Sequence, residues 1–134
     1  MPVLFEFAVI PDITVNPMTS VSVVMPSSVS LNCTAIGVPS PSITWIKSNG
    51  SETVFSEGVT SDNGRDITVT NTPSGMMVES TFTISSTVVL DAASYICMAS
   101  NTLGSNNSTV TLLTVEGKSF FKASKFSFIA TLNN

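Results

Sequence analysis

Histidine is absent from this sequence of 134 residues, and tryptophan and tyrosine occur once each. Without histidine, the Ser–His and Cys–His pairs that activate a nucleophile have no base available. The carboxylates are scattered through segments rich in turn-forming residues rather than gathered in pairs. We therefore expect no catalytic residues, no enzymatic activity, no cofactor and no small-molecule substrate.

Basic residues are also scarce. Charged residues make up 10% of the chain, and three of the five basic residues are Lys118, Lys122 and Lys125. Residues 1–117 therefore carry two basic and nine acidic groups, a net charge of −7. A surface without clustered lysine or arginine cannot neutralise phosphates, so we expect no binding to nucleic acid.

Long apolar runs are missing as well. No stretch reaches the roughly 18 consecutive apolar residues of a membrane-spanning helix. The first eleven residues lack a basic segment and hold Glu6 inside their apolar run, which is not typical of a signal peptide. We expect the chain to be a fragment of a longer protein or an incomplete gene model, and to reach a membrane only through segments outside this sequence.

Serine and threonine are abundant, with 22 and 17 copies, and hydrophobic residues make up 43% of the chain. Short alternating or β-branched runs recur about every 8 to 12 residues, separated by Pro, Gly, Asn and Ser, as in an all-β sandwich or barrel. Clusters of turn residues include 62–64 and 104–106. The runs predict strands near 12–16, 20–24, 29–36, 43–48, 53–56, 66–70, 79–85, 93–99 and 108–115.

The two cysteines stand 64 positions apart, each on the apolar face of an alternating segment. The period of two places Cys33 and Cys97 inward, together with Trp45 and Tyr95. We therefore predict one buried Cys33–Cys97 disulfide that packs against Trp45. Such a bond forms in an oxidising compartment, which predicts an extracellular or cell-surface protein.

Cys33, Trp45 twelve residues later, and the run Asp91-x-Ala93-x-Tyr95-x-Cys97 resemble strands B, C and F of the immunoglobulin fold. Residues 35–45 and 99–104 are similar to its I-set subclass, which occurs in adhesion molecules, receptor ectodomains, matrix proteins and muscle filaments. The resemblance implies a Greek-key β-sandwich of two antiparallel sheets, with Tyr95 as its tyrosine corner. Ala93 departs from the pattern because glycine is commoner there.

The resemblance covers about residues 10–116 and divides the chain into three parts. Residues 1–9 are expected to be an extension or linker, 10–116 the immunoglobulin-like domain, and 117–134 a tail outside the sandwich. The tail holds four of the eight phenylalanines beside three lysines. It is either a linker or an incorrect gene end, or a basic and aromatic segment that rests on an anionic membrane.

Two polar groups have competing interpretations. Asp91 is expected in the core, where it accepts amide protons of its turn or pairs with Arg65, the only arginine. Asp62, Asn63 and Asp66 could hold calcium, but their spacing is not that of an EF-hand and an ordinary turn is favoured. We therefore predict no metal site. Thr87 replaces an aliphatic core residue of the family, which predicts a looser or shifted turn before Asp91.

Four Asn-x-Ser/Thr sequons make Asn32, Asn49, Asn106 and Asn107 candidate glycosylation sites. The last two overlap, so only one of them is expected to be used. Chance is a competing explanation because serine and threonine are so frequent.

Alternation also predicts a binding surface. With Trp45 and Cys97 inward, Ile46, Ile96 and Met98 must point outward from the sheet of strands C, F and G. We expect them to form an exposed apolar patch that binds a protein partner, homophilic or heterophilic. Val110 and Leu112 extend this patch if the alternation of the last strand points their side chains outward.

The leading hypothesis is an extracellular recognition or cell-adhesion module of a larger adhesion molecule or receptor. One alternative is an intracellular filament-type structural domain whose cysteines stay reduced. The other is the ectodomain of a protein whose enzymatic part lies outside this chain.

Overall fold

The computed structural model describes residues 7–62 and 64–117, and these residues form strands connected by short turns. One 3-10 turn, η1 (Val89–Asp91), interrupts them. The strands are β1 (Val9–Val15), β2 (Ser20–Val24), β3 (Val29–Val38), β4 (Ser42–Ser48), β5 (Glu52–Phe55), β6 (Gly58–Asp62), β7 (Arg65–Ser74), β8 (Met77–Ile84), β9 (Ala93–Asn101), β10 (Gly104–Asn107) and β11 (Thr111–Glu116).

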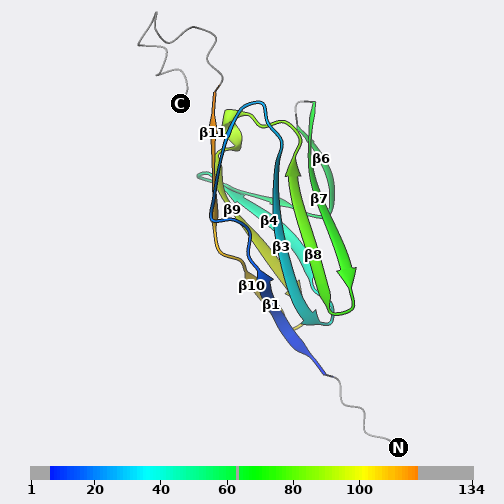
Figure 1. Ribbon diagram of the computed structural model, residues 1–134. Coiled ribbons are helices and arrows are strands. Elements are labelled where there is room, and N and C mark those ends of the chain that lie inside the picture. The colour runs from blue at the N-terminus through cyan, green and yellow to red at the C-terminus, as the bar shows by residue number, and fades with distance from the viewer. Residues whose placement is uncertain (1–6, 63, 118–134) are drawn as a thin grey trace, which may run out of the picture.

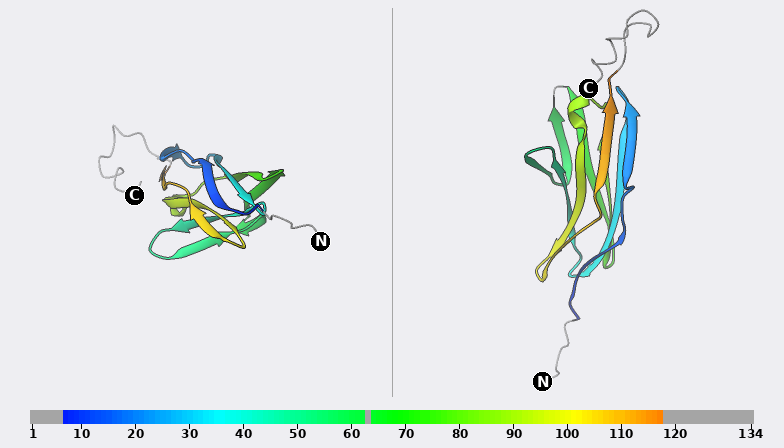
Figure 2. Two further views of the ribbon diagram at one scale, coloured as in Figure 1. Left: turned by 90° about the horizontal axis from the view of Figure 1, so that it is seen from below. Right: turned by 90° about the vertical axis from the view of Figure 1, so that its left-hand side faces the viewer.

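The strands form two sheets that pack face to face (Figures 1 and 2). The first sheet has the order β1-β3-β8-β7-β6, and the second has β2-β11-β9-β4-β5 with β10 paired to β9. Strands β1, β3, β6, β7 and β8 lie in the first sheet and the others in the second, so the chain crosses repeatedly between the sheets, as in a Greek-key sandwich. The predicted immunoglobulin-like β-sandwich is confirmed.

One strand pair corrects the expectation of two purely antiparallel sheets. Strand β2 runs parallel to β11, with Leu112 opposite Ser20. The chain crosses from the first sheet to the second between β1 and β2, where Pro17 is buried. Proline has no N–H for a ladder, so β1 ends there and β2 continues beside the last strand, as the right-hand view of Figure 2 shows.

Alternation builds the core between the sheets. In β9 every second residue from Ala93 to Ala99 is buried, and β3 buries Val29, Leu31, Cys33 and Ala35 in the same way. The ring of Phe82 lies 5.5 Å from that of Trp45 and 5.4 Å from that of Tyr95, measured between centroids. The large aromatic side chains of both sheets therefore meet in one cluster.

Two segments differ from the predicted strands. Residues 104–107 form β10, where a turn was expected, because they fold back on β9 with Asn107 opposite Met98. Residues 58–62 form the edge strand β6, which the sequence did not indicate because all five residues are exposed and show no apolar alternation.

The described strands begin at Val9 and end at Glu116, at opposite ends of the sandwich (Figure 1). The expected tail lies outside the described residues from 118 onward. No helix in the described ranges is long and apolar enough to cross a membrane.

Candidate functional site

The disulfide predicted from the alternation is present. Cys33 and Cys97 are bonded, with 6.4 Å between their Cα atoms, and neither is exposed to solvent. Trp45 is fully buried on β4, directly opposite Cys97 in the pairing with β9. Its indole Nε1 donates a hydrogen bond of 2.8 Å to Ser80 Oγ on the first sheet. This indole therefore links the two sheets beside the disulfide.

The open question about Asp91 is settled by its contacts. Its carboxylate accepts hydrogen bonds from both terminal nitrogens of Arg65, at 2.5 and 2.7 Å, and also from the amide of Val88. Asp62 binds the same arginine from the exposed side. The hydrogen bonds that Arg65 donates to Asp91 raise the pKa of Arg65, so the guanidinium remains charged. Both expected roles of Asp91 therefore occur together.

Tyr95 completes this end of the sandwich. Its hydroxyl donates to the carbonyl of Asp91 at 2.6 Å, the contact of a tyrosine corner. Burial raises the pKa of the Tyr95 hydroxyl. We call Arg65, Asp91 and Tyr95 the polar anchor. It ties β7 of the first sheet to the turn before β9 of the second.

The turn before Asp91 is closely connected, although Thr87 departs from the family pattern. Thr87 is fully buried, and its hydroxyl accepts a hydrogen bond from the amide of Ser27. Its own amide donates to the carbonyl of Ser27. These two hydrogen bonds tie the turn to Ser27 where the family has aliphatic packing.

Aliphatic side chains follow one line across the outer surface of the second sheet. Ile46 on β4 lies opposite Val54 on β5 and opposite Ile96 on β9. Leu112 on β11 pairs with Ser94, two residues before Ile96. Since Thr111 and Leu113 are buried, Leu112 points outward. We call the apolar face the outward side chains of Ile46, Val54, Ile96, Met98, Val110 and Leu112.

The members of this face differ in exposure. Ile46, Ile96 and Met98, which the sequence predicted to be exposed, are half-buried because each is flanked by side chains of adjacent strands. The exposed members are Val54, Val110 and Leu112, each with at least half of its surface accessible. Val54 was missed because the pairing of β4 with β5 depends on the turn between them.

The outer surface of the first sheet is hydroxyl-rich instead. The hydroxyls of Ser30 and Thr83 lie 3.0 Å apart, and Thr81 donates to the side chain of Asn32. Both pairs join β3 to β8 directly across the ladder. Polar side chains thus bond to one another across β3 and β8 on this sheet.

The four sequon asparagines are all exposed. Asn32 lies on the hydroxyl-rich surface of β3, and Asn49 lies in the turn between β4 and β5. Asn106 and Asn107 lie on β10, where Asn107 is the pairing partner of Met98. A glycan at Asn32 would leave the apolar face open.

The candidate calcium turn is only partly described, since Asn63 lies outside the described residues. Asp62 is bound to Arg65, and Asp66 lies at the start of β7. Within residues 7–62 and 64–117, no three acidic, cysteine or histidine residues come together as a metal site.

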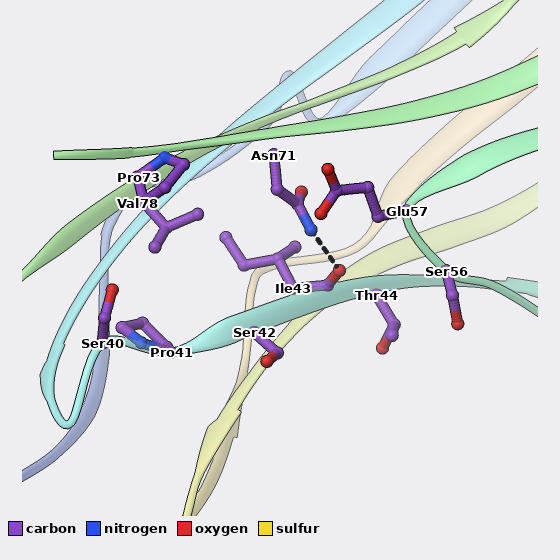
Figure 3. Close-up of a pocket in the computed structure, with 10 residues that line it drawn as sticks. All are labelled: Ser40, Pro41, Ser42, Ile43, Thr44, Ser56, Glu57, Asn71, Pro73 and Val78. Carbon is purple, nitrogen blue, oxygen red and sulfur yellow. Dashed lines mark hydrogen bonds between the residues drawn. The ribbon is translucent and has the colours of Figure 1, made fainter.

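A separate pocket of about 450 Å³ opens between the sheets at their edge (Figure 3). It lies between β4 and the β7–β8 hairpin. No motif in the sequence indicated it.

Comparisons with known proteins agree with this architecture. Residues 10–101 match the family model described as the immunoglobulin domain. No curated protein matches the sequence. Among solved structures, 1127 chains match, so the fold is widely shared and does not by itself specify a partner.

Two of the similar structures contain several domains of this type. A chain in the crystal structure of Dpr2 Ig1–Ig2 in complex with DIP-Theta Ig1–Ig3 has a TM-score of 0.65 and 19% identity, over 81% of this chain and 33% of that one. The structure of the tandem Ig repeats of Dlar has a TM-score of 0.62 and 30% identity, over 84% of this chain and 51% of that one. The chain thus spans a third to a half of these structures.

Proposed function

Because the chain belongs to the immunoglobulin domain family, we propose that it is a non-catalytic recognition module of an extracellular adhesion molecule or receptor. It binds a protein partner through the apolar face of the second sheet. The I-set subclass is part of this proposal.

The apolar face carries the proposal. Val54, Val110 and Leu112 are each about half exposed or more, and Val54 lies opposite the half-buried Ile46, which pairs in turn with Ile96. Aliphatic side chains gathered on one face of a sheet are typical of an interface, whereas single ones scattered over a surface are not. On the first sheet, the facing side chains of β3 and β8 are hydroxyls and an amide instead.

The similar structures support a protein partner. One of them is a complex between two proteins built from such domains, Dpr2 and DIP-Theta. The buried disulfide supports an oxidising, extracellular location. The exposed sequons support a glycoprotein, which mass measurement before and after enzymatic deglycosylation of the secreted protein would test.

Charge on the apolar face tests its role. We expect the double variant Val54→Asp/Leu112→Asp to abolish binding, because it buries two carboxylates in any interface formed there. Sedimentation equilibrium at rising concentration measures homophilic binding, and an array of cell-surface ectodomains measures heterophilic binding. The matched control is Val59→Asp, on the exposed edge strand β6 of the other sheet.

The expected result is that the wild-type protein and the Val59→Asp variant bind equally, while the double variant does not bind and keeps its melting midpoint. Equal binding by all three proteins would show that the apolar face is idle. Loss of binding in the control alone would move the interface to the edge of the first sheet.

We also propose that residues 10–116 hold the domain and that 117–134 lie outside the sandwich; at the other end, strand β1 begins one residue earlier than expected, at Val9, which pairs with Val38. Strand β11 ends at Glu116, whose carbonyl accepts from the amide of Met25. Truncation after Gly117 therefore keeps every described strand. A loss of more than about 1 kcal/mol in denaturant melts would contradict this boundary.

A further inference from the structure

The inter-sheet pocket has apolar walls and a polar end. Pro41 and Ile43 from β4 and its preceding turn face Pro73 and Val78 from the β7–β8 hairpin. Its volume of about 450 Å³ falls within the range of about 300–1,000 Å³ typical of ligand sites. The pocket does not include the apolar face, so its role is independent of the function proposed above.

Asn71 is the unusual residue of this pocket. It follows Ile67 and Val69 on the inward side of β7, where alternation would place a third apolar side chain. Its amide nitrogen donates a hydrogen bond of 3.0 Å to the carbonyl of Ile43, joining the two sheets. This bond fixes the orientation of the amide, because the reverse orientation would place two acceptors together.

The other atom of this amide is left over. Asn71 Oδ1 is buried and accepts no hydrogen bond from any described residue. The carboxylate of Glu57 lines the same pocket, and Figure 3 shows it turned toward the amide of Asn71. The hydroxyl of Thr44 also lacks a partner among these residues, but it points away from this amide. Asn71 Oδ1 and the Glu57 carboxylate are therefore acceptors to which no described residue donates a hydrogen bond.

The Glu57 carboxylate and the lack of a lysine or arginine among the described lining residues favour a positively charged ligand. Of the two cations in residues 1–117, Arg65 is held by Asp91 and Asp62, and Lys47 donates to the carbonyl of Leu90. Neither of them lines the pocket. Two acceptors, one of them anionic, favour a positively charged donor, and the apolar walls favour a hydrocarbon attached to it.

We propose that this pocket binds a primary ammonium on a hydrocarbon stem, the chemistry of a lysine side chain of a partner protein. The stem lies between the proline, isoleucine and valine walls. The ammonium donates to Asn71 Oδ1 and to the carboxylate of Glu57.

Titration of the ¹⁵N-labelled full chain with Nα-acetyl-lysine N-methylamide tests the site by NMR. We expect saturable shifts of the Asn71 side-chain NH₂ and of the Ile43 and Glu57 amides, with a Kd of about 1–10 mM because the probe is small. The norleucine analogue has the same stem without the ammonium, and it should leave these signals in place.

Two variants sharpen the test. Glu57→Gln removes the charge in an exposed segment and should weaken binding about fivefold, as expected for loss of a solvent-accessible ion pair. Glu79→Gln removes an exposed charge of the same kind from β8, outside the pocket, and should leave the Kd unchanged. Equal shifts with the norleucine probe, equal weakening by both variants, or no shift at Asn71 would each overturn the proposal.

Discussion

Two polar clusters lie along strand β7, six residues apart, and they differ in how completely their atoms are paired. At Arg65, the polar anchor pairs the guanidinium, the Asp91 carboxylate and the Tyr95 hydroxyl with partners in the chain. At Asn71, one amide atom bonds across the sheets and the other bonds to no described residue. Polar groups that satisfy one another stabilise a fold, whereas an unpaired buried acceptor lowers stability and leaves an atom for another molecule.

The largest expected loss of stability comes from removing the disulfide that joins the two sheets. Replacing Cys33 and Cys97 with alanine should cost about 4 kcal/mol in the free energy of unfolding, because a bond across 64 positions strongly restricts the unfolded chain. Urea denaturation measures the loss. We expect hydrogen exchange to accelerate near both clusters, since the disulfide joins the sheets that hold them. A loss below about 1 kcal/mol would show that packing alone holds the two sheets together.

The next change breaks the polar anchor alone. Asp91→Ala should cost about 3–5 kcal/mol, because it leaves Arg65 without its buried partner and the Val88 amide without an acceptor. The control is Asp62→Ala, which removes the second partner of the same arginine. Asp62 is 48% exposed against 1% for Asp91, so its loss should cost at most about 1 kcal/mol. Equal losses in denaturant melts would contradict the difference in burial.

The tyrosine of the polar anchor makes the stability of the fold depend on pH in the alkaline range. The pKa of Tyr95 is raised in the folded state, so its contribution is fully present below the ordinary value of about 10. Stability should fall as the pH rises from there through the raised pKa, because the unfolded chain ionises first. As the only tyrosine, it can be followed by tyrosinate absorbance.

Tyr95→Phe supplies the control for this titration. Below pH 10 it should cost about 1 kcal/mol for the lost hydrogen bond to the Asp91 carbonyl. It should also flatten the alkaline decline in stability. An unchanged decline would assign the alkaline unfolding to another group.

The contrast between the clusters also separates what the sequence predicted from what it did not. Period-two alternation placed Cys33, Trp45, Tyr95 and Cys97 inward, and the resemblance to a known family added the tyrosine corner. These residues were predictable because two independent signals agree, the period-two alternation that predicts burial and the motif of the family. The pairing of Arg65 with Asp91 stayed open because it depends on how a turn approaches the start of β7.

The inter-sheet pocket lay beyond sequence reasoning for a physical reason. Asn71 belongs to no motif, and its environment comes from Glu57 and Ile43, which approach only after the sheets pack. Val54 was missed similarly, because the register of an edge strand depends on its turn. The one available signal was Asn71 itself, an amide at an inward position after Ile67 and Val69.

The smallest expected effect tests the contrast most directly. Asn71→Leu loses the hydrogen bond to the Ile43 carbonyl, which costs about 1 kcal/mol, but it also removes the unpaired acceptor and fills apolar space. These contributions oppose one another, so urea denaturation should show a change within about 1 kcal/mol of zero. A loss above about 2 kcal/mol would show that Asn71 supports the fold as Asp91 does. A near-zero change together with loss of lysine-probe binding would instead assign Asn71 to recognition rather than stability.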